Sequence, residues 1–196
     1  MFDYHALLGV AGGLLGLAGF YPYIRDILKG TTKPHPFSWF IWSVVSAIGF
    51  FAQLAGGGGA GALVTAAGSF GCIVVTLLSL TRGEKGIVLL DWFSLCGALL
   101  SLVFWRLTND PLAATVLVTL TDALASVPTF RKSYLRPYGE TPAIYAIGVL
   151  AFSLGLLGLD SFTLTTALFP TYVIAANAVL VGILIIRRKT LPQNQA

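Results

Sequence analysis

The chain has 196 residues, of which 56% are hydrophobic and only 10% are charged. A soluble domain carries about 25% charged residues, so this composition excludes an ordinary soluble domain and indicates an integral membrane protein. The net charge of +4 comes from basic residues that lie between apolar segments. We therefore attribute it to membrane topology and not to a nucleic-acid-binding surface.

Seven apolar segments approach the length of about 20 residues that a helix needs to cross the hydrocarbon layer. In chain order they cover residues 5–28, 37–55, 60–81, 87–105, 111–131, 142–159 and 164–186. The fifth and sixth begin with a capping residue and a proline, Asp110-Pro111 and Thr141-Pro142. Glycines in the first segment form a face suited to close helix contact: Gly9, Gly12, Gly13, Gly16 and Gly19. The sequence therefore predicts an all-α membrane protein with seven transmembrane helices.

Basic residues gather at alternate ends of these segments. Eleven of the 12 Lys and Arg residues follow the first, third, fifth or seventh segment: Arg25, Lys29, Lys33, Arg82, Lys85, Arg131, Lys132, Arg136, Arg187, Arg188 and Lys189. Cytoplasmic ends of membrane helices carry an excess of Lys and Arg, so we expect the N-terminus outside and the C-terminus in the cytoplasm. The expected location is the plasma membrane.

The chain contains an internal duplication with an offset of 106 residues. The offset aligns, without a gap, Pro22 with Pro128, Arg25 with Arg131, Pro36 with Pro142, Ile41 with Ile147 and Gly49 with Gly155. We expect a first three-helix repeat at 1–83, a linker helix at 84–107, a second three-helix repeat at 108–189 and a cytoplasmic tail at 190–196. The linker crossing makes the two repeats parallel, an arrangement that places a substrate site near the middle of the membrane.

Two prolines occupy equivalent places near the cytoplasmic end of the first helix of each repeat. Pro22 and Pro128 cannot donate hydrogen bonds to the carbonyls of Ala18 and Leu124, so each is expected to bend its helix. A packing kink is the simpler explanation for either proline alone. Their symmetric placement favours a pair of hinges beside an inner gate.

The stretch PYIRDILKGTTKPHPFSWFIW at Pro22–Trp42 combines a helix-end proline, a basic loop and a serine that opens the next helix. It returns more weakly as PTFRKSYLRPYGET at Pro128–Thr141. Together with the 3+1+3 pattern, these motifs resemble the PQ-loop superfamily, which includes SWEET sugar transporters. The chain would be a bacterial-type seven-helix member without the PQ dipeptide, since Tyr23 and Thr129 follow the prolines. The resemblance implies a uniporter-like carrier that works by alternating access.

Candidate solute contacts come partly from the residues themselves and partly from this resemblance. Asp122 lies about twelve residues, or roughly 18 Å, into the fifth helix, where an ionised carboxylate costs about 2.5–3.5 kcal/mol. It could bind substrate, act as a proton-linked switch or form a packing hydrogen bond. SWEET-like pockets imply contacts from the third helix of each repeat and from the outer half of the second. The predicted substrate-binding residues are Asp122, Asn177, Phe50, Phe51, Gln53 and Thr76.

The inner gate is expected where the hinge prolines meet the basic loops. Its candidate residues are Tyr23, Arg25, Arg131, Trp39 and Trp42. The two tryptophans are also suited to anchoring at the membrane interface. Asp91 and Glu140 could pair with Arg82 or Arg131 as a gate latch. His5 and His35 have no second ligand at metal spacing, so we expect no metal site.

These features predict a transporter that moves a small neutral or polar solute, sugar-like or vitamin-like. The alternative is a non-transporting seven-helix receptor or adaptor, but its external face would hold only Asp3, Arg106, Asp110 and Asp160 as charges. An enzyme is not expected, because no nucleophile–base pair or metal cluster is present in the sequence. We expect no cofactor and no nucleic-acid partner. The expected partners are the lipid bilayer and the solute; proton coupling and homo-oligomer formation are both compatible with the sequence.

Overall fold

The computed structural model describes residues 3–108 and 110–191, and in this part of the chain helices joined by short loops are the regular structure, without strands. The α-helices are α1 (Tyr4–Leu28), α2 (Pro36–Ala55), α3 (Leu63–Arg82), α4 (Leu89–Thr108), α5 (Pro111–Leu135), α6 (Pro142–Leu157) and α7 (Leu164–Thr190). Short 3₁₀ turns, η1 (Gly59–Ala62) and η2 (Pro137–Gly139), precede α3 and α6. The seven predicted helices are thus confirmed. Helices α5 and α7 run about one turn further than expected because their basic last turns are good helix formers and complement the helix dipole.

The local start signals operate differently at the two predicted caps. Asp110 caps α5, since its carboxylate accepts a hydrogen bond from the backbone N–H of Leu112 at 2.9 Å. Thr141 precedes Pro142 at the start of α6 but makes no capping hydrogen bond. Its hydroxyl instead donates to the carboxylate of Asp26 at 2.9 Å, so this residue joins its loop to the last turn of α1 and does not cap its own helix.

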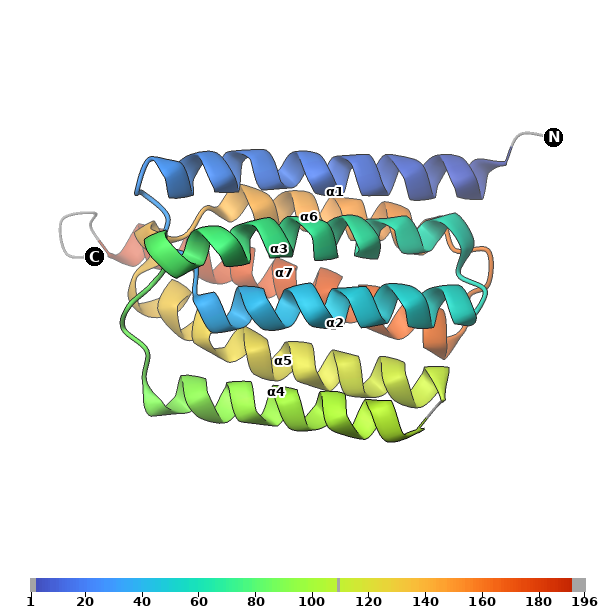
Figure 1. Cartoon of the computed structure of the whole chain (residues 1–196). Coiled ribbons are helices and arrows are strands. Elements are labelled where there is room, and N and C mark those ends of the chain that lie inside the picture. The colour runs from blue at the N-terminus through green and yellow to red at the C-terminus, as the bar shows by residue number, and fades with distance from the viewer. Residues whose placement is uncertain (1–2, 109, 192–196) are drawn as a thin grey trace.

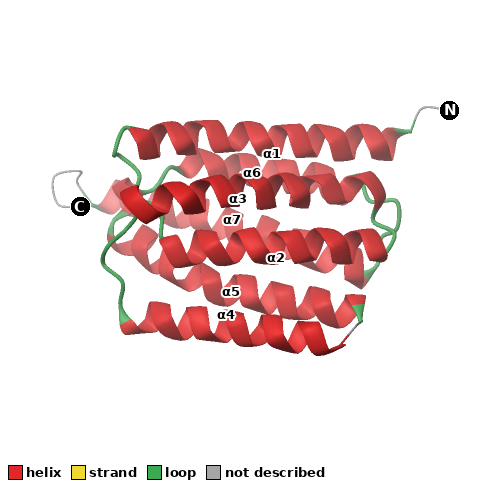
Figure 2. Cartoon of the chain, viewed as in Figure 1, coloured by secondary structure: helices red, strands yellow, loops and turns green. Residues whose placement is uncertain are grey.

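The helices lie side by side and alternate in direction, so their connections collect at two ends of the bundle (Figures 1 and 2). One end, where α1 begins, holds η1 and the loop between α6 and α7; we call it the amino-terminal end. The other end holds loops 29–35, 83–88 and 136–141 and the close of α7, and we call it the basic end. The charge alternation in the sequence therefore identified loops that share one end of the molecule.

The surface of the bundle is apolar and much of its interior is polar. Large apolar side chains such as Leu14, Leu77, Leu80 and Phe70 are exposed along the helices. Serine, threonine and charged side chains lie inside together with apolar ones, and so many buried polar groups beneath an apolar surface are unusual in water-soluble proteins. Helices α1, α2, α5 and α7, and α3 with its preceding turn, are long and apolar enough to cross a membrane. The structure is compatible with an integral membrane protein.

Helix α6 is shorter than the segment 142–159 that the sequence predicts. It is apolar but has only 16 residues, and it ends at Leu157 with Gly158 as its C-cap. A helix of this length spans about 24 Å, somewhat less than the hydrocarbon layer.

The helices pack in a regular scheme. Helix α3 contacts both α1 and α2, and α7 contacts both α5 and α6. These two groups meet where α1 packs on α6 and where α2 packs on α5, while α4 lies mainly against α5. The apolar core between them includes Tyr23, Trp39, Ile41, Val45, Val118, Phe169 and Leu180.

At the amino-terminal end, α1, η1 and α6 pack so closely that their backbones touch, and glycines occupy the contact points. A Cβ atom added to Gly61 would lie 2.5 Å from the carbonyl oxygen of Gly155, and one added to Gly9 would lie 2.2 Å from the carbonyl oxygen of Ala60. A Cβ on Gly158 would lie 2.7 Å from the backbone nitrogen of Gly9. We call Gly9, Gly61, Gly155 and Gly158 the glycine junction. The close contact expected along the glycine face of α1 is therefore confirmed.

Candidate functional site

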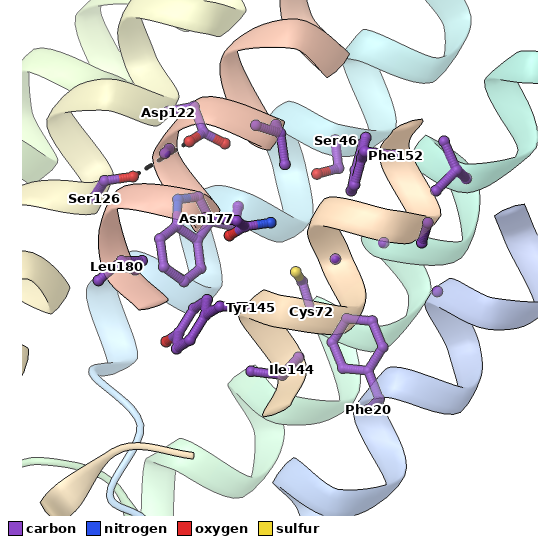
Figure 3. A pocket seen from close by; sticks show the side chains of 18 of the residues that line it. Phe20, Ser46, Cys72, Asp122, Ser126, Ile144, Tyr145, Phe152, Asn177 and Leu180 are labelled. Atoms are coloured by element: carbon purple, nitrogen blue, oxygen red, sulfur yellow. Dashed lines mark hydrogen bonds between the residues drawn. The ribbon is translucent and has the colours of Figure 1, made fainter. Parts of the chain in front are cut away.

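A cavity of about 100 Å³ lies between the two groups of helices (Figure 3). Helices α1, α2, α3, α5, α6 and α7 contribute to its wall, and none of the described lining residues comes from α4. The lining consists of Gly16, Phe20, Trp39, Trp42, Ser46, Val64, Gly68, Cys72, Asp122, Ser126, Ile144, Tyr145, Gly148, Ala151, Phe152, Val173, Ala176, Asn177 and Leu180. The cavity is mostly apolar with a few polar groups from different helices, the usual character of a small-molecule site.

Asp122 provides the carboxylate of this cavity. Its side chain is 6% exposed, and the hydroxyl of Ser126, one turn further along α5, donates a hydrogen bond to it at 3.3 Å. The Ser126 hydroxyl also lies 3.3 Å from that of Tyr172 on α7. The carboxylate is therefore held by neutral hydroxyls on α5 and α7.

Two further polar side chains face the cavity. Asn177 on α7 and Ser46 on α2 both line it (Figure 3), and neither side chain has a hydrogen-bond partner among the described residues. Gly148 on α6 leaves room for the Asn177 amide, because a Cβ at that glycine would lie 2.6 Å from the amide nitrogen. Both side chains are thus available to a bound molecule.

Aromatic rings form the part of the cavity wall nearest the basic end. Trp39 and Trp42 pack edge to face with ring centroids 5.1 Å apart, and Phe20 lies 6.2 Å from Trp39. The Phe20 ring sits against Gly71 on α3, where an added Cβ would lie 2.2 Å from it. Tyr23 continues this group away from the cavity, with its ring 4.8 Å from Trp39.

The structure brings together only some of the predicted substrate-binding residues. Asp122 and Asn177 line one cavity, but Phe50, Phe51, Gln53 and Thr76 lie outside its lining. Phe51 is 65% exposed on the outer surface. The side chain of Gln53 donates to the carbonyl of Thr166 at 2.9 Å, and the hydroxyl of Thr76 donates to the carbonyl of Cys72 at 2.7 Å.

The α2 residues that line the cavity lie nearer the basic end than the outer half of α2, where the resemblance implied solute contacts. Trp39, Trp42 and Ser46 lie on one helical face. The next position on that face is Gly49, and the ring of Phe169 fills the space beside it. The spacing of three and four residues from Trp39 to Trp42 and Ser46 could have identified Ser46 from the sequence. The repeat offset could have identified Tyr145, since it pairs this residue with Trp39 and both line the cavity. No sequence signal marked Phe20.

A buried ion pair lies next to the cavity wall, toward the basic end. Lys132 on α5 pairs with Glu140 before α6, and both side chains are at most 2% exposed. The second carboxylate oxygen of Glu140 accepts hydrogen bonds from the hydroxyls of Tyr23 at 2.9 Å and Tyr145 at 3.1 Å. Tyr145 also lines the cavity, so the ion pair is directly connected to the cavity wall.

Lys132 and a neighbouring threonine pair tie the loops of the basic end together. The ammonium group of Lys132 donates to the carbonyl of Lys33 and, at 3.4 Å, to that of Gly139. The hydroxyls of Thr32 and Thr141 lie 2.5 Å apart. Loop 29–35 is thereby joined to loop 136–141.

A second buried cluster surrounds Asp91, at the start of α4. Its carboxylate contacts a guanidinium nitrogen of Arg131 at 3.1 Å and Nε2 of His35 at 3.3 Å, and it accepts the backbone N–H of Val88 at 2.9 Å. We call Asp91, Arg131, His35, Lys132 and Glu140 the paired-charge layer. The predicted pairing of Asp91 with Arg131 is confirmed. Glu140 instead pairs with Lys132, the residue after Arg131 on α5, whose side chain points into the bundle.

The predicted gate residues divide between this layer and the surface. Tyr23, Trp39 and Trp42 stack beside the layer, and Arg131 belongs to it. Arg25 instead pairs with the adjacent Asp26 at 2.8 Å, with its side chain 48% exposed. The prolines of the two predicted hinges, Pro22 and Pro128, lie inside α1 and α5, as expected.

His35 should make the stability of the protein depend on pH. Burial lowers its pKa below the usual 6.5; Asp91 opposes this effect, and Lys132 and Arg131 add to it. At pH values between the lowered pKa of the folded state and the usual pKa of about 6.5, the unfolded chain binds more protons at His35 than the folded chain does. The contribution of neutral His35 to folding stability is therefore complete above about pH 6.5 and is lost as the pH falls through this range.

We therefore expect the thermal midpoint in detergent to fall between about pH 7.5 and pH 5.5, and to fall less in His35→Gln. The matched control is His5→Gln, which removes a histidine at the amino-terminal end, away from Asp91 and its partners. An unchanged pH dependence in His35→Gln would show that this prediction is wrong.

No family model, curated protein or solved structure matches this chain. The cavity and the paired-charge layer are therefore the features from which function is inferred.

Proposed function

We propose that the protein is a membrane transporter that moves a small solute through the cavity by alternating access. The observation that carries the proposal is the position of the cavity. Both groups of helices line it, with Asp122 and Asn177 facing its interior. A layer of dissociable side-chain pairs is joined to its wall through Tyr145, toward the basic end. A solute site beside a separable set of contacts is what alternating access requires.

The packing scheme supports a 3+1+3 arrangement of parallel repeats. In each group the third helix lies between the other two, and the first helix of each group packs on the second helix of the other. Helices α1 and α5 run in the same direction (Figure 1). The 106-residue offset carries Pro36 at the start of α2 onto Pro142 at the start of α6. Helix α4 would then be the linker of a PQ-loop, SWEET-like protein.

The expected orientation places the basic end in the cytoplasm of a bacterial cell. This end holds the residues of the charge alternation, and the excess of Lys and Arg favours the cytoplasmic side of the inner membrane. The paired-charge layer would then be the inner gate.

The hinge prolines are well placed to move this gate. Pro22 immediately precedes Tyr23, which binds Glu140, and Pro128 lies one turn before Lys132. Because a proline removes one backbone hydrogen bond, bending at these points costs little. A bend at either proline would separate the partners of Glu140 and open the cavity toward the basic end.

The transport hypothesis can be tested in liposomes with a panel of labelled monosaccharides, vitamin heterocycles and amines. We expect at least one solute to enter faster than into empty liposomes. The double variant Pro22→Ala/Pro128→Ala should slow its entry at least about tenfold, because stiffer helices open the gate less often. Its thermal stability should be equal to or above that of the parent.

The matched control is Pro142→Ala, which alters a proline in the first turn of α6, where no intrahelical hydrogen bond is missing. This variant should transport at the parent's rate. The transporter proposal would be wrong if every solute in the panel crossed no faster than in empty liposomes. The hinge proposal alone would fail if the double proline variant transported normally.

A further inference from the structure

The cavity has an uncompensated charge. Asp122 is the carboxylate of its wall, and the described lining residues include no lysine, arginine or histidine. The groups around that carboxylate are neutral: the hydroxyls of Ser126 and Tyr172 and the indole of Trp42. Lys132, further along α5, is already paired with Glu140. A carboxylate in an apolar interior needs a positive partner or a proton, and here the protein provides no cation.

Five aromatic side chains line the cavity, from α1, α2 and α6. They are Phe20, Trp39, Trp42, Tyr145 and Phe152, of which Phe20, Tyr145 and Phe152 are labelled in Figure 3. The face of an aromatic ring attracts a cation and its edge packs against apolar groups. Carboxylate and rings together form the environment that binds an ammonium group with an apolar body.

The same lining disfavours other ligand classes. An amino acid or an organic acid would bring a carboxylate into a cavity that already holds Asp122 and has no cation to receive a second one. A sugar would bring many hydroxyl groups, whereas the described lining offers few polar side chains without a hydrogen-bond partner: Ser46, Asn177 and the indole N–H groups of Trp39 and Trp42. Unpaired hydroxyls in such a site cost binding free energy.

The size of the cavity limits the ligand further. Its volume is about 100 Å³, and an engineered apolar cavity of about 150 Å³ holds benzene in another protein. The body of the ligand is therefore no larger than a single small ring, and a short branched chain fits with less movement of the wall.

We propose that the cavity binds a small organic monocation, a protonated amine with a single-ring or short-chain body. The ammonium group would lie against the carboxylate of Asp122 and the ring of Trp42, and the body would pack among Phe20, Tyr145 and Phe152. Ser46 and Asn177 would accept or donate one further hydrogen bond. This inference rests on the proposed function, because it names the class of solute for the same cavity.

The test uses the purified full-length protein in detergent and three probes of matched size: benzylamine, benzyl alcohol and benzoate. Binding is measured by thermal stabilisation and by quenching of tryptophan fluorescence. Isobutylamine and isobutanol provide a second pair with a smaller body. Each amine should bind at least about tenfold more tightly than its alcohol, and benzoate should bind more weakly than either.

Asp122→Asn keeps the shape of the side chain and removes its charge. In this variant benzylamine should lose at least about tenfold in affinity, while benzyl alcohol should bind as in the parent. Asp110→Asn, which alters the cap of α5 outside the cavity, is the matched control and should keep the preference for the amine. A thermal unfolding curve establishes that each variant is folded. Trp42→Leu, which retains the carboxylate, should weaken benzylamine more than benzyl alcohol and gives an independent test.

The proposal is wrong if neither amine binds better than its alcohol, or if Asp122→Asn keeps the preference for the amine. Its failure can be separated from failure of the transporter proposal. Liposomal uptake of a neutral solute, without amine binding, would overturn the proposal that the ligand is a monocation and would leave the transporter proposal standing. Saturable amine binding that depends on Asp122, without uptake of any solute, would retain the site and overturn transport.

Discussion

Lys132→Met should lower the free energy of unfolding by about 3–5 kcal/mol, because it leaves the buried carboxylate of Glu140 without its cation. Lys132 is 2% exposed, and its ammonium group also serves the carbonyls of Lys33 and Gly139. Methionine fills a similar volume but can neither pair with Glu140 nor donate to the two carbonyls. Reversible unfolding in mixed detergent micelles would measure the change.

The double variant Lys132→Met/Glu140→Gln separates loss of the ion pair from loss of packing. It removes both charges, so most of the stability lost in the single variant should return. Lys85→Met is the matched control, since Lys85 lies at the same end of the molecule with an exposed side chain, and its stability should stay within about 0.5 kcal/mol of the parent. If Lys132→Met were as stable as Lys85→Met, the ion pair would not hold the basic end together.

The second large effect is expected at the opposite end, where Gly61→Ala should cost about 3 kcal/mol of stability. The added methyl group would lie 2.5 Å from the carbonyl oxygen of Gly155 and 2.7 Å from the backbone nitrogen of Leu159. These are backbone atoms, so no change of rotamer can relieve the contact, and η1 and α6 would have to move apart. The same unfolding measurement applies.

Gly182→Ala on α7 is the control for this substitution. No atom lies within 4 Å of the position that its Cβ would occupy. The exchange should leave stability unchanged or raise it by up to about 1 kcal/mol, because alanine favours the helix. Equal stability of the two alanine variants would contradict the close packing described for the glycine junction.

The sequence predicted the helices and their grouping at two ends because both depend on local or one-dimensional signals. Runs of apolar residues define the spans, prolines open α2, α5 and α6, and alternating basic residues indicate which loops share an end. Asp122 was recognisable because a charged side chain in a long apolar segment is costly and therefore informative. Asn177 was predicted from the resemblance to SWEET-like pockets.

The rest of the site depends on how each helix is rotated about its axis, which the sequence constrains weakly. The choice between Arg131 and Lys132 as the partner of Glu140 is one example, since adjacent positions differ by about 100° around the helix. The contact between Phe20 and Gly71 is another, because it requires the separation of α1 and α3 to be known. The placement of Phe51 on the outer surface follows from the same rotation.

The glycine junction also has a mechanical consequence for the motion that the proposed transport function requires. Side chains that lock an interface can exchange partners with water, as the pairs around Glu140 can, but Gly9, Gly61 and Gly158 present only main-chain atoms to one another. Such a contact can slide or pivot as a rigid unit. It contains no side chains whose rotamer changes could weaken it step by step. We therefore expect the junction to act as the fulcrum and the basic end to make the wider swing.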